Sequence, residues 1–129
     1  MKLQEILLNY DNVVLGDFED LDVFNFSGVY IICDMEDDIV YVGSAYARTI
    51  KIRLQQYLRP SDTGNTLGKT IAKKLSSSKT YNEKAKERIK DAIKIIKKCK
   101  ICAIPHRDLE YKLIQDIGPK YNNCGKGED

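Results

Sequence analysis

The stretch from Ser27 to Tyr57 constrains the fold of this 129-residue chain more strongly than any other stretch. It contains two short apolar runs, Tyr30–Cys33 and Ile39–Val42, on either side of the acidic segment Asp34–Asp38. Two β-prone runs separated by a short polar turn predict a β-hairpin. We therefore expect the rest of the chain to be organised around this hairpin.

Four side chains of this stretch are expected to meet in one region. Because side chains alternate between the two faces of a strand, Tyr30 and Tyr41 can stand near each other across the hairpin. A helical pattern follows Gly43, and Arg53 and Tyr57, which are four residues apart, share one face of that helix. A single tyrosine on a strand is more often a core residue, and a single arginine on a helix is usually a surface charge. Their joint occurrence indicates a reactive site.

The order of these motifs resembles that of the GIY-YIG nuclease domain. The matching residues are GVY at 28–30, YVG at 41–43, Arg53 with Tyr57 four residues later, Glu110, and PKYN at 119–122. The resemblance covers roughly residues 27–123. It implies an α+β fold (an α/β sandwich) in which helices flank a small three-stranded antiparallel sheet.

Two details of the resemblance point to different branches of this family. The twelve residues from Glu110 to Asn122 match the spacing in the nuclease domain of the UvrC repair protein. In contrast, Ser44 directly after YVG replaces the lysine of the UvrC domain and is more like phage homing nucleases.

The resemblance implies a site that hydrolyses phosphodiester bonds. Tyr41 is expected to act as the general base and Tyr30 to support it, whereas the always-charged fork of Arg53 matches phosphate oxygens. Tyr57 occupies the position where relatives carry a Tyr or His that contacts the phosphate or the nucleophile. The catalytic candidates are Tyr30, Tyr41, Arg53, Tyr57, Glu110 and Asn122.

One divalent metal ion is the expected cofactor. Glu110 supplies a hard oxygen ligand for Mg²⁺ or Mn²⁺, and waters and the phosphate complete the shell. Asn122 is expected to hold Glu110 or the neighbouring backbone in place. Cys99 and Cys102 match a CxxC spacing, but they fall in a predicted strand without a second pair, so a zinc site is not favoured.

Charge is distributed unevenly along the chain, although the net charge is only +2. Residues 1–38 carry one basic residue against ten acids, and residues 69–100 carry twelve Lys or Arg against three acids. A basic segment in a nearly neutral protein predicts an electropositive face that binds a polyanion, here DNA; the alternative is a solvated lysine-rich helix. The candidate substrate contacts are Gly43, Ser44, Arg48, Lys69, Lys73 and Lys74.

The length and composition predict a single domain. Residues 1–26 are expected to form an N-terminal helix and an acidic connection, and residues 27–123 the nuclease domain, with a basic helical insertion at about 60–98. The elements expected after the hairpin are helices at about 47–58 and 83–97, a third strand at 98–104, and a last helix from Arg107 or Asp108 to Gly118.

The sequence contains no apolar run near the ~20 residues that span a membrane, and its N-terminus lacks the features of a signal peptide. Four cysteines without a secretory context favour reduced thiols. We therefore expect a cytoplasmic protein without a membrane partner.

These observations favour a stand-alone, metal-dependent DNA endonuclease of the phage, mobile-element or restriction type. The first alternative is a structure-specific repair or recombination nuclease that needs a targeting partner, and the second is an inactive nucleic-acid-binding module. The joint retention of the motif residues argues against the inactive module. The sequence leaves open the choice between DNA and RNA and between monomer and homodimer.

Overall fold

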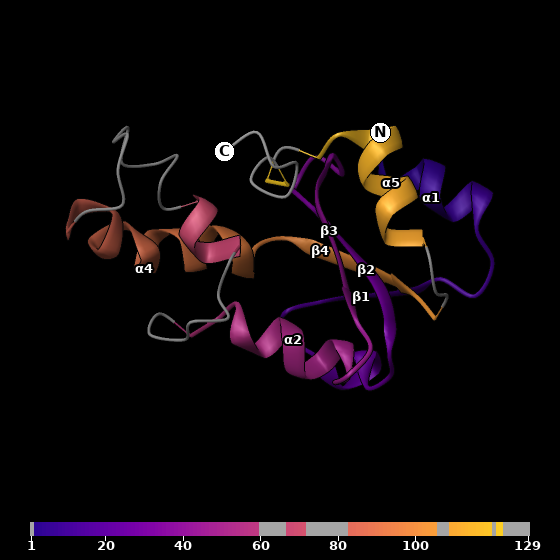
Figure 1. Ribbon diagram of the computed structural model, residues 1–129, viewed down its shortest axis with the longest axis horizontal. Coiled ribbons are helices and arrows are strands. Elements are labelled where there is room, and N and C mark those ends of the chain that lie inside the picture. Colours follow the sequence, from indigo (N-terminus) through magenta and orange to yellow (C-terminus); the bar gives the residue numbers. More distant parts are fainter. Residues whose placement is uncertain (1, 60–66, 72–82, 106–108, 120, 123–129) are drawn as a thin grey trace.

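Four strands form one antiparallel sheet in the order β1-β4-β2-β3 (Figure 1). This computed structural model describes residues 2–59, 67–71, 83–105, 109–119 and 121–122. The strands are β1 (Val14–Asp17), β2 (Gly28–Cys33), β3 (Ile39–Ala45) and β4 (Lys100–Ile104). The helices are α1 (Leu3–Asn9), α2 (Ile50–Gln56), α4 (Glu83–Lys97), α5 (Leu109–Ile117) and the 3₁₀ helix η1 (Leu21–Phe24), and residues 67–71 are also helical.

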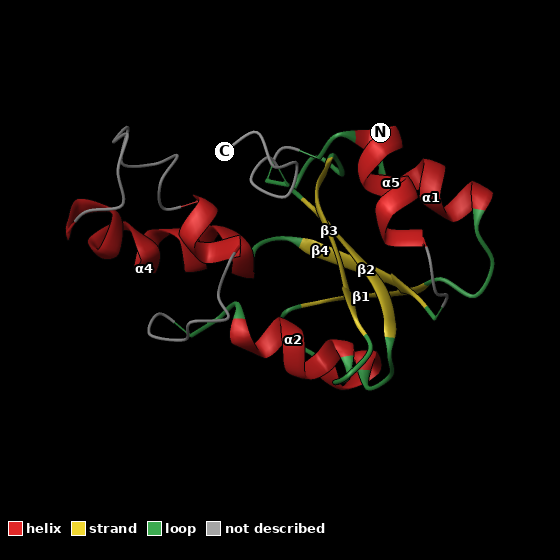
Figure 2. Cartoon of the chain, in the orientation of Figure 1, coloured by secondary structure: helices red, strands yellow, loops and turns green. Residues whose placement is uncertain are grey.

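Helices cover both faces of the sheet, which confirms the expected α+β class. Strand β2 is buried along its whole length, and its side chains alternate between two apolar cores. Tyr30 enters one core with Leu54 of α2, and we call this side of the sheet the α2 face. Ile31 enters the other core with Leu113 of α5, and we call this side the α5 face. Figure 2 shows α1 and α5 together on one side of the sheet and α2 on the other.

The expectation of three strands is wrong by one. The additional strand, β1, lies in the segment that was expected to be an acidic connection, and it pairs with β4. Its sequence, VLGD, is short and contains a glycine and an acid, so it lacks the composition of a strand. At Gly16 a Cβ atom would lie 2.9 Å from the Phe24 ring, so glycine allows η1 to lie against the strand. Backbone pairing along β4, rather than local propensity, places this segment in the sheet.

The helix ends follow local capping. Helix α4 has the predicted range, but α2 begins at Ile50 and not at about residue 47. The Thr49 side chain accepts a hydrogen bond of 3.3 Å from the Ile52 N–H, and this N-cap sets the first turn. Helix α5 ends before Gly118, which adopts a φ of 61° that glycine tolerates at a helix C-terminus.

The sequence predicted no membrane-spanning segment. Among the described residues, no helix is long and apolar enough to cross a bilayer.

Candidate active site

The hairpin β2–β3 positions the first two tyrosines. Tyr30 pairs with Gly43 across the hairpin, so both residues point to the α2 face. A Cβ atom at Gly43 would lie 2.5 Å from Cζ of Tyr30, which means that the tyrosine ring fills the space above the glycine. Gly43 is one of the candidate substrate contacts, and in the structure its missing side chain makes room for Tyr30.

Tyr30, Tyr41 and Tyr57 form a compact group that we call the tyrosine cluster. The ring centroids are 6.4 Å apart for Tyr30–Tyr41, 6.1 Å for Tyr30–Tyr57 and 5.9 Å for Tyr41–Tyr57. The hydroxyls of Tyr30 and Tyr57 hydrogen-bond to each other. Tyr30 is 1% exposed and Tyr57 is 0% exposed, whereas Tyr41 is half-buried. Within the cluster, Tyr41 is therefore the member that reaches the surface.

Burial raises the pKa of the two buried tyrosines, Tyr30 and Tyr57. Loss of solvation raises the pKa of Tyr57 well above its ordinary value of 10.0. Burial and the neighbouring Tyr41 also raise the pKa of Tyr30, against the opposing effects of the Tyr57 hydrogen bond and the Arg53 charge. Both buried tyrosines therefore keep their protons near neutral pH.

Arg53 extends the cluster toward the surface. Its Cζ atom lies 5.0 Å from the centroid of the Tyr57 ring, in a cation–π arrangement. Its Nη1 atom donates a 2.7 Å hydrogen bond to Oε1 of Gln56. Sequence reasoning missed Gln56, although its position three residues after Arg53 on the same helix is a signal for such a contact.

Glu110 lies on the other face of the sheet. It is half-buried in the first turn of α5, and its Oε1 accepts a 2.7 Å hydrogen bond from the Ser44 hydroxyl. Ser44 pairs with Val29, whose side chain belongs to the core of the α5 face. Tyr41 and Ser44 are three residues apart on β3, an odd spacing that sends their side chains to opposite faces. The structure thus brings Ser44 and Glu110 together, apart from the tyrosine cluster but on the same edge strand.

Asn122 occupies the free edge of β3 between these two groups. Its Oδ1 accepts a 2.9 Å hydrogen bond from the Val42 N–H, and its Nδ2 donates a 3.0 Å hydrogen bond to the Val42 carbonyl. The Tyr121 N–H donates to the Val40 carbonyl at 2.8 Å, so the chain continues along the same edge. Asn122 thereby holds the neighbouring backbone, which is one of the two roles expected for it.

The other candidate substrate contacts are Arg48, Lys69, Lys73 and Lys74. Arg48 is exposed on the loop before α2, and its carbonyl accepts a 3.3 Å hydrogen bond from the Ser27 hydroxyl. Lys69 is half-buried in the helical residues 67–71. Lys73 and Lys74 lie outside the residues that the structure describes.

A family model for the GIY-YIG catalytic domain matches residues 26–122, the span that runs from the start of the hairpin to Asn122. The chain belongs to the GIY-YIG family. A comparison with curated proteins found no match. Family membership implies nuclease chemistry in general, with DNA as the substrate and a divalent metal ion as the usual cofactor.

The residues present fit the metal requirement of a GIY-YIG domain. Among the described residues, no group of three His, Cys, Asp or Glu side chains is arranged so that it could hold a metal ion. Mg²⁺, however, retains waters and is commonly bound by one or two carboxylates with substrate phosphates. Glu110 is a half-buried carboxylate whose Oε1 is held by Ser44, so it suits a site with a single protein carboxylate.

The CxxC pair is arranged differently from a zinc site. Cys99 belongs to the core of the α2 face, and Cys102 belongs to the core of the α5 face. Burial raises the pKa of the Cys99 thiol to about 11, and its Sγ donates to the Ile95 carbonyl at 3.4 Å. The two thiols therefore act as separate core residues.

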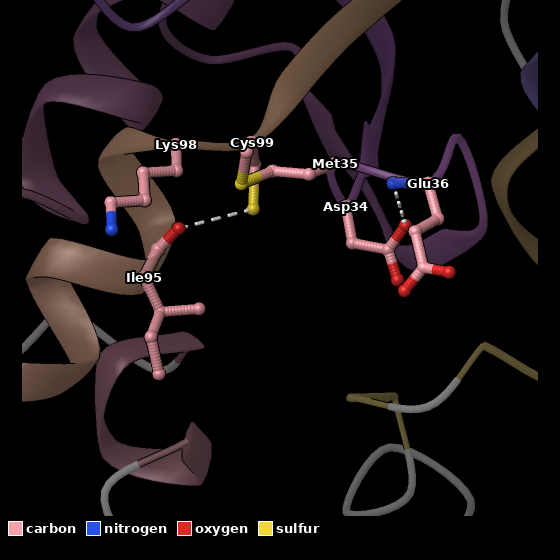
Figure 3. Close-up of a pocket in the computed structure, with 6 residues that line it drawn as sticks. All are labelled: Asp34, Met35, Glu36, Ile95, Lys98 and Cys99. Atoms are coloured by element: carbon pink, nitrogen blue, oxygen red, sulfur yellow. Dashed lines mark hydrogen bonds between the residues drawn. The ribbon is translucent and has the colours of Figure 1, made fainter.

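A cavity of about 270 Å³ lies between the β2–β3 turn and the end of α4 (Figure 3). Its lining residues are Asp34, Met35, Glu36, Ile95, Lys98 and Cys99. None of these is a family motif residue, so the cavity is distinct from the GIY-YIG site.

Proposed function

We propose that this GIY-YIG domain is a metal-dependent endonuclease that hydrolyses DNA phosphodiester bonds along the β3 edge. The observation that carries the proposal is that the tyrosine cluster with Arg53 and the Ser44–Glu110 pair are attached to opposite faces of one edge strand. A phosphodiester bound over Asn122, which covers this edge, would face both groups.

Tyr41 is the proposed proton acceptor for the attacking water. It combines partial exposure with contacts to both buried tyrosines. The Arg53 guanidinium, which interacts electrostatically with Tyr41, supplies a positive charge beside the cluster. Tyr30 and Tyr57 would hold the Tyr41 ring and the guanidinium in place, since neither buried hydroxyl reaches the surface.

Arg53 is proposed to stabilise the charge that develops on the phosphoryl oxygens. Its planar fork can donate two parallel hydrogen bonds to a phosphate, a geometry that lysine does not offer. Donors that are already oriented before the reaction contribute most to such stabilisation. Arg53 meets this condition through its contacts with Tyr57 and Gln56.

Glu110 is the residue proposed to hold the divalent ion. When bound there, Mg²⁺ or Mn²⁺ supplies Lewis-acid stabilisation of the departing 3′ oxygen. The hydrogen bond from Ser44 fixes one carboxylate oxygen and so directs the other.

The DNA backbone is proposed to run along the lysines of α4. Lys90, Lys94 and Lys97 are exposed, and their spacing places them on one side of the helix. Among the described residues, no carboxylate lies within ion-pair distance of these three lysines. By contrast, Lys2, Lys51 and Lys100 form ion pairs with Asp38, Asp22 and Asp37. A row of cations that makes no ion pair with the described part of the chain suits a phosphate backbone.

The test is cleavage of supercoiled plasmid and of branched DNA with Mg²⁺, with Mn²⁺ and with EDTA. Wild-type protein is expected to nick DNA only with metal, and Glu110→Gln is expected to reduce the rate by at least about 100-fold, because the ligand charge is lost. Asp116→Asn, at an exposed position of the same helix, is the matched control. Discrete plasmid fragments would favour the restriction or homing type, and cuts at branches the repair type. Salt-sensitive DNA binding without cleavage under any metal would leave only the binding module.

A further inference from the structure

Gln56 is a buried polar residue that the proposed chemistry does not use directly. It is the last residue of α2 and is 9% exposed. Its Oε1 accepts a 2.7 Å hydrogen bond from Nη1 of Arg53. A buried side-chain amide that receives a hydrogen bond from an active-site guanidinium calls for a functional explanation as well as a structural one.

Two contacts fix the Arg53 guanidinium in different ways. Its Cζ atom stacks on the Tyr57 ring, which restrains the distance from the ring but allows rotation in the guanidinium plane. The hydrogen bond to Gln56 restricts that rotation, because it ties one named nitrogen, Nη1, to a fixed acceptor. Together the two contacts restrain both the plane of the fork and its direction within the plane.

The choice of glutamine has an electrostatic consequence. A carboxylate at this position would hold the guanidinium equally well, but it would neutralise the charge that the phosphate must meet. A neutral amide oxygen orients the arginine and leaves its full positive charge available.

We infer that Gln56 is a positioning residue that orients Arg53 toward the scissile phosphate. This inference rests on the proposed nuclease function for its effect on rate, but the orientation itself is a property of the free protein. A small misplacement of a group that acts on the transition state can cost about 100-fold in rate, so the effect is expected in the chemical step rather than in DNA affinity.

The test compares single-turnover cleavage, DNA affinity and thermal stability in three variants. Gln56→Met removes the acceptor at similar volume, Gln56→Glu keeps an acceptor and adds a negative charge, and Gln55→Met is the control on the neighbouring, half-buried position. We expect Gln56→Met and Gln56→Glu each to cleave about 10- to 100-fold more slowly with DNA affinity within about threefold of wild type. Gln55→Met is expected to cleave at the wild-type rate.

A second readout does not depend on activity. In the NMR spectrum of the free protein, the Arg53 guanidinium of the wild type and of Gln56→Glu is expected to rotate slowly, and that of Gln56→Met is expected to rotate measurably faster. Restricted rotation with no cleavage by wild-type protein would contradict the nuclease proposal but support the positioning of Arg53. Wild-type cleavage by Gln56→Met, or free rotation of Arg53 in the wild type, would overturn the positioning role. If Gln56→Met does not fold, Gln56→Glu carries the test, and a wild-type rate in that variant also overturns the inference.

Discussion

At the scale of single residues, the tyrosine cluster depends on a glycine. Tyr30 lies over Gly43, where a Cβ atom would overlap the ring and hydroxyl. We expect Gly43→Ala to lower the free energy of unfolding by about 1–3 kcal/mol, the usual cost of overpacking a core. Urea denaturation measures this change.

The matched comparison for Gly43→Ala is the same substitution in a Tyr30→Ala background. There the space above residue 43 is empty, so the alanine is expected to cost less than about 0.5 kcal/mol. An equal cost in both backgrounds would show that the crowding between Tyr30 and Gly43 is not the reason for the glycine.

The sequence predicted which residues form the cluster but not their exposure. The alternation of a strand and the four-residue spacing of a helix placed Tyr30, Tyr41, Arg53 and Tyr57 together. The complete burial of Tyr57 could not be predicted, because it depends on how the end of α2 packs on the sheet. The contact between Arg53 and Gln56, by contrast, is local, because the two residues are three apart on one helix.

At the scale of elements, we predict that the exposed lysines of α4 contact the DNA backbone. Replacing Lys90, Lys94 and Lys97 with glutamine is expected to weaken DNA binding and to reduce the magnitude of the negative salt-dependence slope, d log K/d log[salt], by about 2–3. The expected loss is similar for unrelated DNA sequences, because phosphate contacts carry no sequence information.

The control for the α4 lysines is the pair Lys51→Gln and Lys112→Gln. Lys51 is already paired with Asp22 at 2.6 Å, and Lys112 is exposed on α5, in the opposite helix layer. Titrations at several salt concentrations measure both sets of variants. An unchanged slope in the α4 variant would contradict its role as a backbone contact and would favour the solvated helix.

Elements with a strong periodic pattern were predicted well, and the short elements β1 and η1, which lack such a pattern, were not. The range of α4 follows from its apolar stripe, in which Ile89, Ile93 and Ile96 are buried. Strand β1 has four residues and no such signal, so its place in the sheet depends on the partner strand β4.

At the scale of the whole molecule, the site is divided by the sheet. The tyrosine cluster belongs to the α2 face and Glu110 to the α5 face, and β3 is the edge strand that joins them. Asn122 covers the edge between the two groups by pairing with both polar backbone groups of Val42. The motifs predicted the members of this site, but their distribution over two faces depends on the register of β3 and on the packing of α5.

A nuclease site at this edge requires that Tyr41, the cluster member that reaches the surface, takes part in the reaction. The most direct test is the single-turnover rate of metal-dependent DNA cleavage by Tyr41→Phe, with circular dichroism and DNA affinity measured on the same samples. A proton-transfer role predicts a rate at least about 100-fold below wild type, with the fold and DNA affinity preserved. Cleavage by Tyr41→Phe at the wild-type rate would contradict the proposed role of Tyr41 in proton transfer.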